Sequence, residues 1–226
     1  MTGDPLVVAD SLTRSFGAGA TIVTAVADAS FTVAASNRIA LVGPSGSGKS
    51  TLLHLVAGLD RPTGGEISWP ALGDREDLRP GQVGVAFQGP SLLPPLTVLE
   101  NIELPVILAG RSEEVARAAA VDLIDAFGLS GLEDKLPEEL SGGQSQRAAV
   151  ARAFAGAPRL VLADEPTGQQ DHANAERLID AMLAIAKVDG TSLLIATHDW
   201  SVAERFETRW SMESGSLRTK EVPCSA

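Results

Sequence analysis

The stretch that decides the fold lies in the first quarter of the chain and reads Gly43-Pro44-Ser45-Gly46-Ser47-Gly48-Lys49-Ser50. It fits the P-loop pattern, in which glycines let the backbone curl and point its amides at a phosphate. A flexible Gly/Ser turn could match the same pattern by chance. The position argues against that, because the apolar run 39–42 precedes the loop and a helical stretch, 51–57, follows it.

The residue types in this loop suggest particular roles at the phosphates of a nucleotide. Lys49 is expected to reach the β- and γ-phosphates, and the Ser50 hydroxyl is expected to bind Mg²⁺. The helix that opens near Lys49 adds the positive end of its dipole. The predicted phosphate-binding residues are Gly43, Pro44, Ser45, Gly46, Ser47, Gly48, Lys49, Ser50 and Thr51. This motif alone does not distinguish kinases, GTPases and motor proteins, which share it.

Three continuous apolar runs, 39–42, 160–163 and 192–196, predict strands that are buried on both faces of a parallel sheet. Each run is followed by residues able to do chemistry: the glycine loop, the acids Asp164 and Glu165, and then Thr197-His198-Asp199. Parallel α/β sheets bind ligands at the carboxyl ends of their strands. We therefore expect the three groups to converge.

The rest of the chain predicts an α/β fold with two additions. Short β-like runs between Leu6 and Val33, with a turn at 17–20, indicate an antiparallel β region at the start. Helical patterns over 98–109, 113–127 and 142–155 indicate an α-helical sub-domain at about 89–157, inserted into a core of 1–88 and 158–226.

Three finer expectations concern the faces and turns of these elements. The second helix should bury Val115, Ala119, Leu123 and Phe127, which follow a four-residue ridge. A further helix at 173–188 should place Leu178, Met182 and Ile185 on one face. The segment 208–220 is expected to form a hairpin around Ser214-Gly215.

Composition restricts the class of protein. The chain has 226 residues, of which 44% are hydrophobic, which suits one α/β domain or one domain carrying a sub-domain. Its 18 basic and 29 acidic side chains give a net charge of -11, which argues against duplex binding. The single cysteine, Cys224, excludes an internal disulfide. No run is long and apolar enough to span a bilayer, and residues 1–8 lack a signal-peptide pattern, so we expect a cytoplasmic protein.

The stretch Leu162-Ala163-Asp164-Glu165 is an apolar strand that ends in two acids. Asp164 is expected to hold the Mg²⁺ shell, and Glu165 to polarise the attacking water. An Asp-Glu pair is commonplace in solvated turns. The preceding strand and the P-loop favour the catalytic interpretation here.

The pentapeptide Leu140-Ser141-Gly142-Gly143-Gln144, followed by Gln146-Arg147, makes the sequence resemble the ABC ATPase family. Ser141 and Gln144 also form the pattern of a capping box for the following helix, and both interpretations are compatible. A capped helix start with two glycines presents amides and a dipole to an anion. The resemblance implies that this anion is the γ-phosphate held by the P-loop of a second copy.

The resemblance implies roles for four further residues. Gln88, after the predicted strand 83–86, matches the family's Q-loop and would touch Mg²⁺ or the water. His198 matches the switch histidine at the γ-phosphate, and Asp171 the D-loop aspartate. Phe16 lies where the family stacks an aromatic residue on adenine. The implied catalytic residues are Glu165, His198, Lys49 and Gln88, the metal ligands Ser50, Gln88 and Asp164, and the remaining nucleotide contacts Phe16, Ser141, Gly142, Gly143, Gln144 and Asp171.

The resemblance extends from about Leu6 to Lys220, with the motifs in the family's order. The segments 52–63, 92–94, 96–101 and 103–105 are similar to the branch with lipoprotein-release, macrolide-efflux and cell-division ATPases. Two features depart from the pattern. The D-loop reads Gln169-Gln170-Asp171, and residues 69–80 match no family pattern and are expected to be peripheral.

The family resemblance implies ATP and Mg²⁺ as cofactors, a homodimer around two ATP molecules, and an integral membrane permease that holds the chain at the inner face of the membrane. The permease is expected to dock near Gln88 to Leu96, where the stretch 92–96 is unusually apolar for a loop, although ordinary packing under the sub-domain explains that stretch equally well. No nucleic-acid partner is expected. Three alternatives remain: an ATPase that transmits force to a membrane complex without transport, a soluble non-transport ABC protein, and a regulator that binds ATP without hydrolysis.

Overall fold

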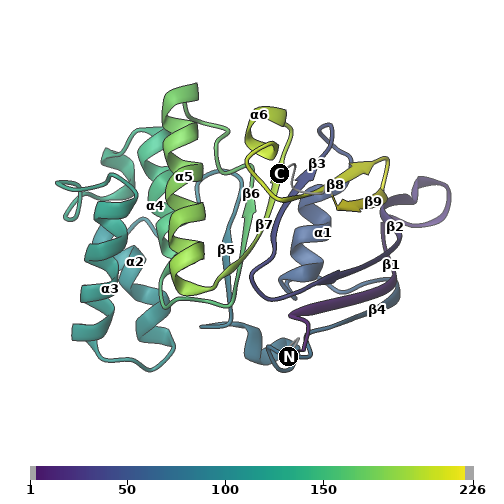
Figure 1. The fold of residues 1–226 in the computed structure, drawn as a ribbon, viewed down its shortest axis with the longest axis horizontal. Coiled ribbons are helices and arrows are strands. Elements are labelled where there is room, and N and C mark those ends of the chain that lie inside the picture. Colours follow the sequence, from purple (N-terminus) through teal and green to yellow (C-terminus); the bar gives the residue numbers. More distant parts are fainter. Residues whose placement is uncertain (1–3, 222–226) are drawn as a thin grey trace. The chain divides into compact units, whose positions relative to one another are not determined.

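The computed structural model describes residues 4–221, which form two compact units (Figure 1). Unit 1 comprises residues up to 78 together with those from 192 onward, and unit 2 comprises residues 79–191. Predictions that concern the first three residues or Cys224 fall outside the described part of the chain. The predicted fold class, an α/β fold with mainly parallel strands, an antiparallel start and added helices, is confirmed.

The antiparallel region of unit 1 is made of three strands, β1 (Val7–Phe16), β2 (Val23–Val33) and β4 (Gly64–Ser68). β1 pairs antiparallel with both of the others. The turn predicted at 17–20 overlaps a 3₁₀ turn, η1 (Gly19–Thr21), and the later β-like runs predicted before Val33 form one continuous strand, β2.

The parallel part of unit 1 is centred on β3 (Arg38–Val42), which pairs parallel with β7 (Ser192–Thr197) and with β8 (Thr208–Glu213). β8 continues into β9 (Ser216–Glu221) through the predicted hairpin. Ser214 and Gly215 both have left-handed φ, 48° and 83°, as a tight hairpin turn between twisted strands requires. The strand order in this unit is β4-β1-β2-β9-β8-β3-β7.

Two helices cover this part of unit 1. Helix α1 (Lys49–Val56) packs against β2 and β7, and the short helix α6 (Trp200–Ala203) packs against β3 and β7. The segment that matches no family pattern packs under the end of α1 and includes the 3₁₀ helix η2 (Arg75–Leu78). Trp69 Nε1 donates to the carbonyl of Val56 at 2.8 Å, and Leu78 is fully buried. The expectation that this segment is peripheral fits its exposed residues but not Trp69, Leu72 and Leu78, which are buried in the core of unit 1.

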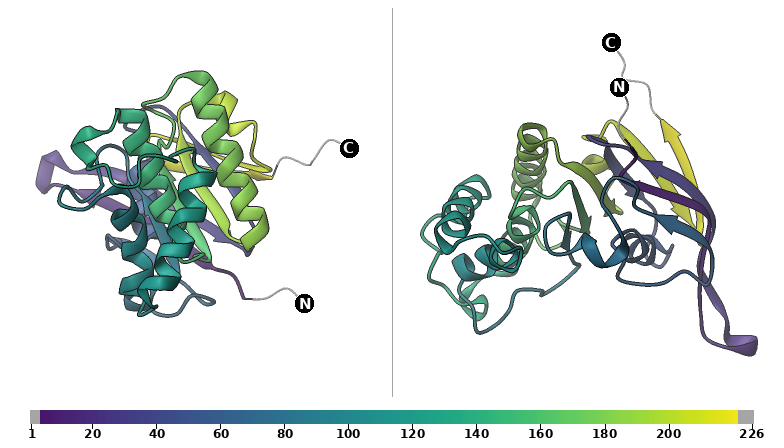
Figure 2. Two further views of the ribbon diagram at one scale, coloured as in Figure 1. Left: turned by 90° about the vertical axis from the view of Figure 1, so that its left-hand side faces the viewer. Right: turned by 90° about the horizontal axis from the view of Figure 1, so that it is seen from below.

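Unit 2 contains a parallel pair of strands and a group of helices. β5 (Val83–Ala86) pairs with β6 (Leu160–Asp164), and both lie against α4 (Gly142–Phe154). Helix α2 (Val98–Leu108) packs against α3 (Glu113–Ala126) and α4, as the teal group in Figure 2 shows, and η3 (Pro137–Glu139) and α5 (His172–Asp189) complete the unit. The predicted helix ends differ from these by one or two residues.

The predicted buried face of α3 is wrong in its first half. Val115 is 44% exposed and Ala119 is half-buried, whereas Leu123 and Phe127 are buried as expected. The buried face instead consists of Ala116, Ala120, Leu123 and Ile124. Small alanines let α3 lie close to its neighbours, and the larger Val115 turns toward an apolar groove of about 700 Å³ in unit 2. On α5, Leu178 and Met182 are buried and Ile185 is half-buried.

Candidate functional site

The glycine loop of unit 1 links β3 to α1, and its backbone packs closely against β2 and β8. Lys49 and Ser47 are buried, with 6% and 3% of their surface exposed. A Cβ added at Gly48 would collide with the carbonyl oxygen of Ala25, and one at Gly43 with that of Met212. The backbone of the loop therefore approaches its neighbours as closely as only glycine allows, and this fixes the direction of its amides.

The start of α1 differs from that of every other α-helix in the described residues. The other five begin with a side chain that accepts a hydrogen bond from the first turn, namely Thr97, Ser112, Ser141, Asp171 and Asp199. α1 begins at Gly48, with a left-handed φ of 108° and no side-chain cap. Its first amides and its positive dipole end therefore suit an external anion, such as a phosphate.

The ammonium group of Lys49 lies across the beginning of the same loop. Nζ donates to the carbonyl of Gly43 at 2.8 Å and to that of Pro44 at 3.1 Å. The Lys49 ammonium already donates to two carbonyls at the start of the loop, so it is well placed to exchange them for phosphate oxygens.

His198 lies at the same edge of unit 1 as the glycine loop. Thr197 is the register partner of Val42 in the β3–β7 pair, so the residues that follow each strand emerge side by side. A cavity of about 590 Å³ is lined by the start of the loop (Gly43 and Pro44), by His198 and Trp200 after β7, and by the β8–β9 hairpin, including Glu213 and Arg218. The predicted convergence of the glycine loop and the histidine is thus found within this unit.

Unit 2 contains a second convergence of predicted residues. Ala86 is the register partner of Ala163 in the β5–β6 pair, so Gln88 and the acids Asp164 and Glu165 follow neighbouring strand ends. Asp164 is buried, with 6% exposed, and Gln88 is exposed. Glu165 has a left-handed φ of 48°, an unfavourable conformation for a residue with a side chain and one that is enriched at functional sites.

The Ser141–Gln144 turn forms the predicted capping box at the start of α4. The Gln144 amide donates to Ser141 Oγ at 3.3 Å, and the Ser141 amide donates to Gln144 Oε1 at 2.8 Å. The box does not use the amides of Gly142 and Gly143, and Ser141 and Gly142 are exposed. The turn therefore leaves backbone amides at an exposed helix start, a geometry suited to binding an anion.

The D-loop lies directly against this turn. A Cβ at Gly142 would collide with the side-chain oxygen of Gln169, so the unusual glutamine packs on the glycine. Asp171 acts as the N-cap of α5, where Oδ1 accepts from the Asn174 amide at 2.9 Å. Asp171 thus has a structural task in unit 2, whatever it contacts beyond it.

Residues 91–97, immediately after the Q-loop, are held by the side chain of Asn101. Its amide nitrogen donates to the carbonyls of Leu93, Leu96 and Thr97, and its oxygen accepts from the Leu93 amide at 2.8 Å. Arg152 also contacts this segment, through a 3.3 Å hydrogen bond to Ser91 Oγ, and burial lowers the pKa of its guanidinium. Leu92 is buried while Leu93 is 41% exposed, so the apolar stretch serves partly as core and partly as surface.

Three residues near the predicted site were missed from the sequence. Arg152 contacts Ser91 from far along the chain, which no local pattern predicts, and Asn101 contacts a segment only four to eight residues before it. Trp200 follows His198 by two residues and is 61% exposed, a signal that could have been noticed because large aromatic residues seldom stand free in solvent.

The family model described as "ABC transporter" matches residues 26–168 of this chain. The chain belongs to the ABC transporter ATPase family. The lipoprotein-releasing system ATP-binding protein LolD of Legionella pneumophila (strain Paris) is 39% identical, over 96% of this chain and 99% of that protein. An uncharacterized ABC transporter ATP-binding protein of Mycobacterium tuberculosis, MT1014, is 38% identical, over 96% of this chain and 90% of its own length.

The fold of this ABC ATPase is also similar to solved structures. The dimeric bacterial ABC transporter cassette MJ0796 superposes with a TM-score of 0.88 at 33% identity, covering 95% of this chain and 98% of that one. A post-hydrolysis dimer of MJ0796 bound to ADP and Pi gives a TM-score of 0.87. The predictions of an ATP-binding, ATP-hydrolysing ABC cassette and of its similarity to the lipoprotein-release branch are confirmed.

Proposed function

We propose that this ABC ATPase works as a homodimer in which each ATP is held by the glycine loop of one copy and the Ser141–Gly143 turn of the other. The observation that carries the proposal is the exposed, glycine-rich start of α4, whose capping box does not use two of its amides. One similar protein, MJ0796, solved as a dimer in two structures, one of them with ADP and Pi, supports it.

Within each site, the residues of this chain would share the chemistry of phosphoryl transfer. The amides at the start of α1 and the ammonium of Lys49 bind the phosphates, Glu165 orients the attacking water, and His198 stabilises charge on the γ-phosphate. Gln88 follows β5, the strand paired with the β6 strand that precedes Glu165, and it would sense whether the site is filled. Phe16, 43% exposed at the end of β1, is assigned to the adenine ring.

The residue types also fit Mg²⁺. P-loop enzymes hold this ion with few protein ligands, because the nucleotide and water complete its shell. The hydroxyl of Ser50, the carboxylate of Asp164 and the amide of Gln88 are hard oxygen donors of the kind the ion requires. Mg²⁺ would neutralise charge on some of the phosphate oxygens, and Lys49 and His198 would bind the remaining phosphate oxygens.

We assign the exposed part of the Q-loop segment, around Leu93, to a membrane permease. Asn101 and Arg152 hold this segment against α2 and α4, so a force on either side is transmitted through hydrogen bonds rather than through a slack loop. This arrangement would keep the chain at the inner face of the membrane. The described residues contain no helix long and apolar enough to cross one. We assign α2, α3 and α4 to the helical sub-domain at about 89–157; α5, which unit 2 also contains, lies outside that range.

The decisive experiment uses Glu165→Gln, which keeps the shape of the side chain but removes its ability to polarise water. With ATP and Mg²⁺, size-exclusion chromatography with light scattering should show a stable dimer, and phosphate release should be almost abolished. Adding Ser141→Arg, which places a bulky cation on the exposed turn, should return the variant to a monomer while ATP still binds. A Glu165→Gln protein that stays monomeric and hydrolyses ATP at the normal rate would refute the proposal.

A further inference from the structure

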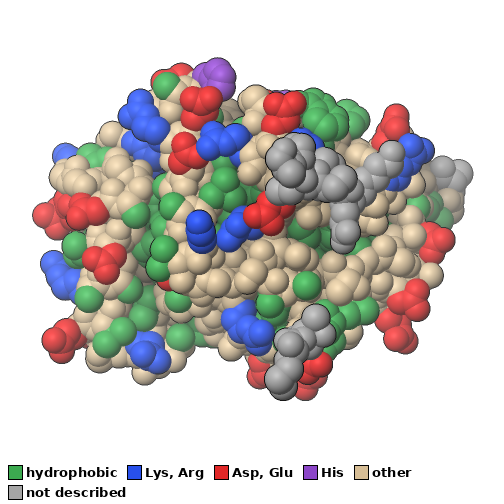
Figure 3. Space-filling view, in the orientation of Figure 1, with side chains coloured by type: hydrophobic (Ala, Val, Ile, Leu, Met, Phe, Trp, Pro, Cys, Tyr) green, Lys and Arg blue, Asp and Glu red, His purple; other side chains and the backbone are tan. Residues whose placement is uncertain are grey.

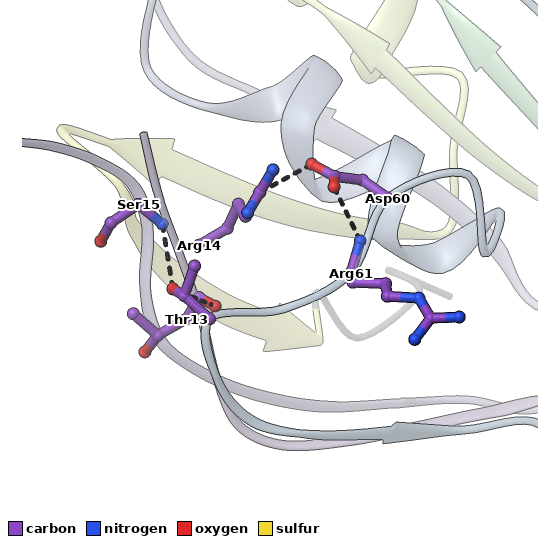
Figure 4. A network of polar contacts seen from close by, with 6 residues as sticks. Thr13, Arg14, Ser15, Asp60 and Arg61 are labelled. Atoms are coloured by element: carbon purple, nitrogen blue, oxygen red, sulfur yellow. Dashed lines mark hydrogen bonds and ion pairs between the residues drawn. The ribbon is translucent and has the colours of Figure 1, made fainter. Parts of the chain in front are cut away.

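Arg14, near the end of β1, is held by an ion pair that the nucleotide motifs do not include. Its Nε lies 2.7 Å from Oδ2 of Asp60, and the two side chains are only 22% and 27% exposed (Figure 4). The other carboxylate oxygen of Asp60 accepts from the Arg61 amide at 2.7 Å. Both oxygens of Asp60 are thus engaged, which fixes the orientation of the guanidinium.

The same guanidinium lies over the ring of Phe16. Its Cζ is 4.4 Å from the ring centroid, within the range of a cation–π contact. Arg14 and Phe16 are two residues apart on one strand, so their side chains lie on the same face of it. Arg14 therefore covers one side of the ring, while 43% of Phe16 remains exposed.

Asp60 is itself fixed to the far end of the P-loop helix. Its amide donates to the carbonyl of His54 in the last turn of α1 at 3.2 Å. Thr63, a few residues on, donates from its amide to Thr13 at 2.8 Å, and its hydroxyl accepts from the Ser15 amide at 3.1 Å. The segment after α1 is therefore bonded to β1 on both sides of Arg14, as Figure 4 shows.

We infer that Arg14 and Asp60 are positioning residues for the adenine base of the nucleotide. They join the strand that carries Phe16 to the helix whose first turn binds phosphates, and so set the separation between the base platform and the phosphate cradle. A nucleotide has a fixed reach between base and phosphates, so this separation selects ligands that carry both. The inference rests on the role proposed for Phe16.

The test compares two ligands that share phosphates but differ in the base: ATP and inorganic tripolyphosphate. In Arg14→Ala and Asp60→Asn, the dissociation constant for ATP should rise about three- to tenfold, while that for tripolyphosphate stays unchanged. The kcat at saturating ATP should also stay close to wild type, because neither residue touches the γ-phosphate. Arg14→Lys keeps the charge but loses the planar contact, and should lie between wild type and Arg14→Ala.

Two controls separate positioning from general damage. Arg61→Ala removes a cation next to Asp60 while keeping the backbone amide that Asp60 accepts from, and should bind both ligands normally. In a Phe16→Ala background, Arg14→Ala should weaken ATP binding no further, because the ring it positions is gone. Thermal melting of each variant checks that it is folded, and Arg14→Lys replaces Arg14→Ala if the latter unfolds.

The outcomes distinguish this inference from the proposed site. If Phe16→Ala weakens ATP binding but Arg14→Ala does not, the inference is overturned and the base platform stands. It is also overturned if Arg14→Ala weakens ATP and tripolyphosphate equally, or if its effect persists without Phe16. If Phe16→Ala leaves ATP affinity unchanged, the assignment of the ring to adenine fails instead, and the positioning role fails with it.

Discussion

At the scale of single residues, the site depends on where a side chain would not fit. Gly48 begins α1 at a left-handed φ, and an added Cβ would meet a backbone carbonyl that no rotamer change can move. Gly46 also has a left-handed φ, 76°, but nothing lies within 4 Å of an added Cβ. An alanine at Gly46 would suffer only the backbone strain of a positive φ, whereas one at Gly48 would suffer that strain and a steric collision as well.

We predict that Gly48→Ala destabilises the protein far more than Gly46→Ala. The Gly46 variant should lose about 1 to 2 kcal/mol from strain alone, whereas the Gly48 variant must also push β2 away from the loop. Urea unfolding of both variants without nucleotide measures the difference. Equal losses would show that the contact between the loop and Ala25 yields without cost.

The sequence indicates candidate site residues more readily than their additional structural contacts. The spacing of glycines and lysine predicts a phosphate loop, because phosphate binding demands those residue types at that spacing. Asp171 shows what such a pattern misses, since its hydrogen bond to Asn174 caps a helix and depends on geometry around it. Arg14 was missed for the same reason, because its partner Asp60 lies far along the chain.

At the scale of elements, strand ends and helix caps were predictable and helix faces less so. The apolar runs that predicted β3, β6 and β7 are buried along their whole length, because a strand covered on both faces admits few polar residues. The face of α3 was mispredicted because a four-residue ridge is shared by several neighbouring faces. Which of them is buried depends on the partner helices, which favour its alanines.

Helix α2 provides a test of local electrostatics through its capping box. Glu100 Oε2 accepts from the Thr97 amide at 2.8 Å, and these hydrogen bonds lower the pKa of the Glu100 carboxyl below 4.5. A carboxyl with a depressed folded-state pKa contributes stability above its unfolded value, and this contribution is lost as the pH falls through the folded value.

Glu100→Gln should therefore melt below wild type at neutral pH, and the gap should shrink as the pH falls below about 4.5. Calorimetric melting of both proteins across this range measures the gap. The exposed Glu114, in the first turn of α3, provides a matched control as Glu114→Gln. A gap that stays constant down to pH 3 would show that the ionisation of Glu100 does not cause the difference in stability.

At the scale of the whole molecule, the net negative charge of each copy opposes the association of two copies. Each copy carries a net charge of -11. On the face shown in Figure 3, Lys and Arg side chains lie scattered among Asp and Glu, so the basic groups drawn there form no continuous stripe. In the proposed dimer, two such copies would approach against long-range repulsion.

We predict that salt strengthens the ATP-bound dimer of Glu165→Gln. Raising the ionic strength from about 0.01 M to about 0.1 M shortens the Debye length from about 30 Å to about 10 Å and screens the repulsion between copies. Sedimentation velocity at both salt concentrations should give a lower dissociation constant at the higher one. A dimer that weakens with salt would indicate that attraction between opposite charges at the interface dominates instead.

The chain has three tryptophans, and two of them, Trp69 and Trp210, are buried in unit 1, with 8% and 4% exposed. Trp200, beside His198, is the one that meets solvent. Fluorescence quenching by acrylamide or iodide therefore reports mainly on this indole. In the proposed dimer, a second copy over the histidine would shield this indole and shift its emission to shorter wavelengths, which would give an optical signal for dimer closure without an attached dye.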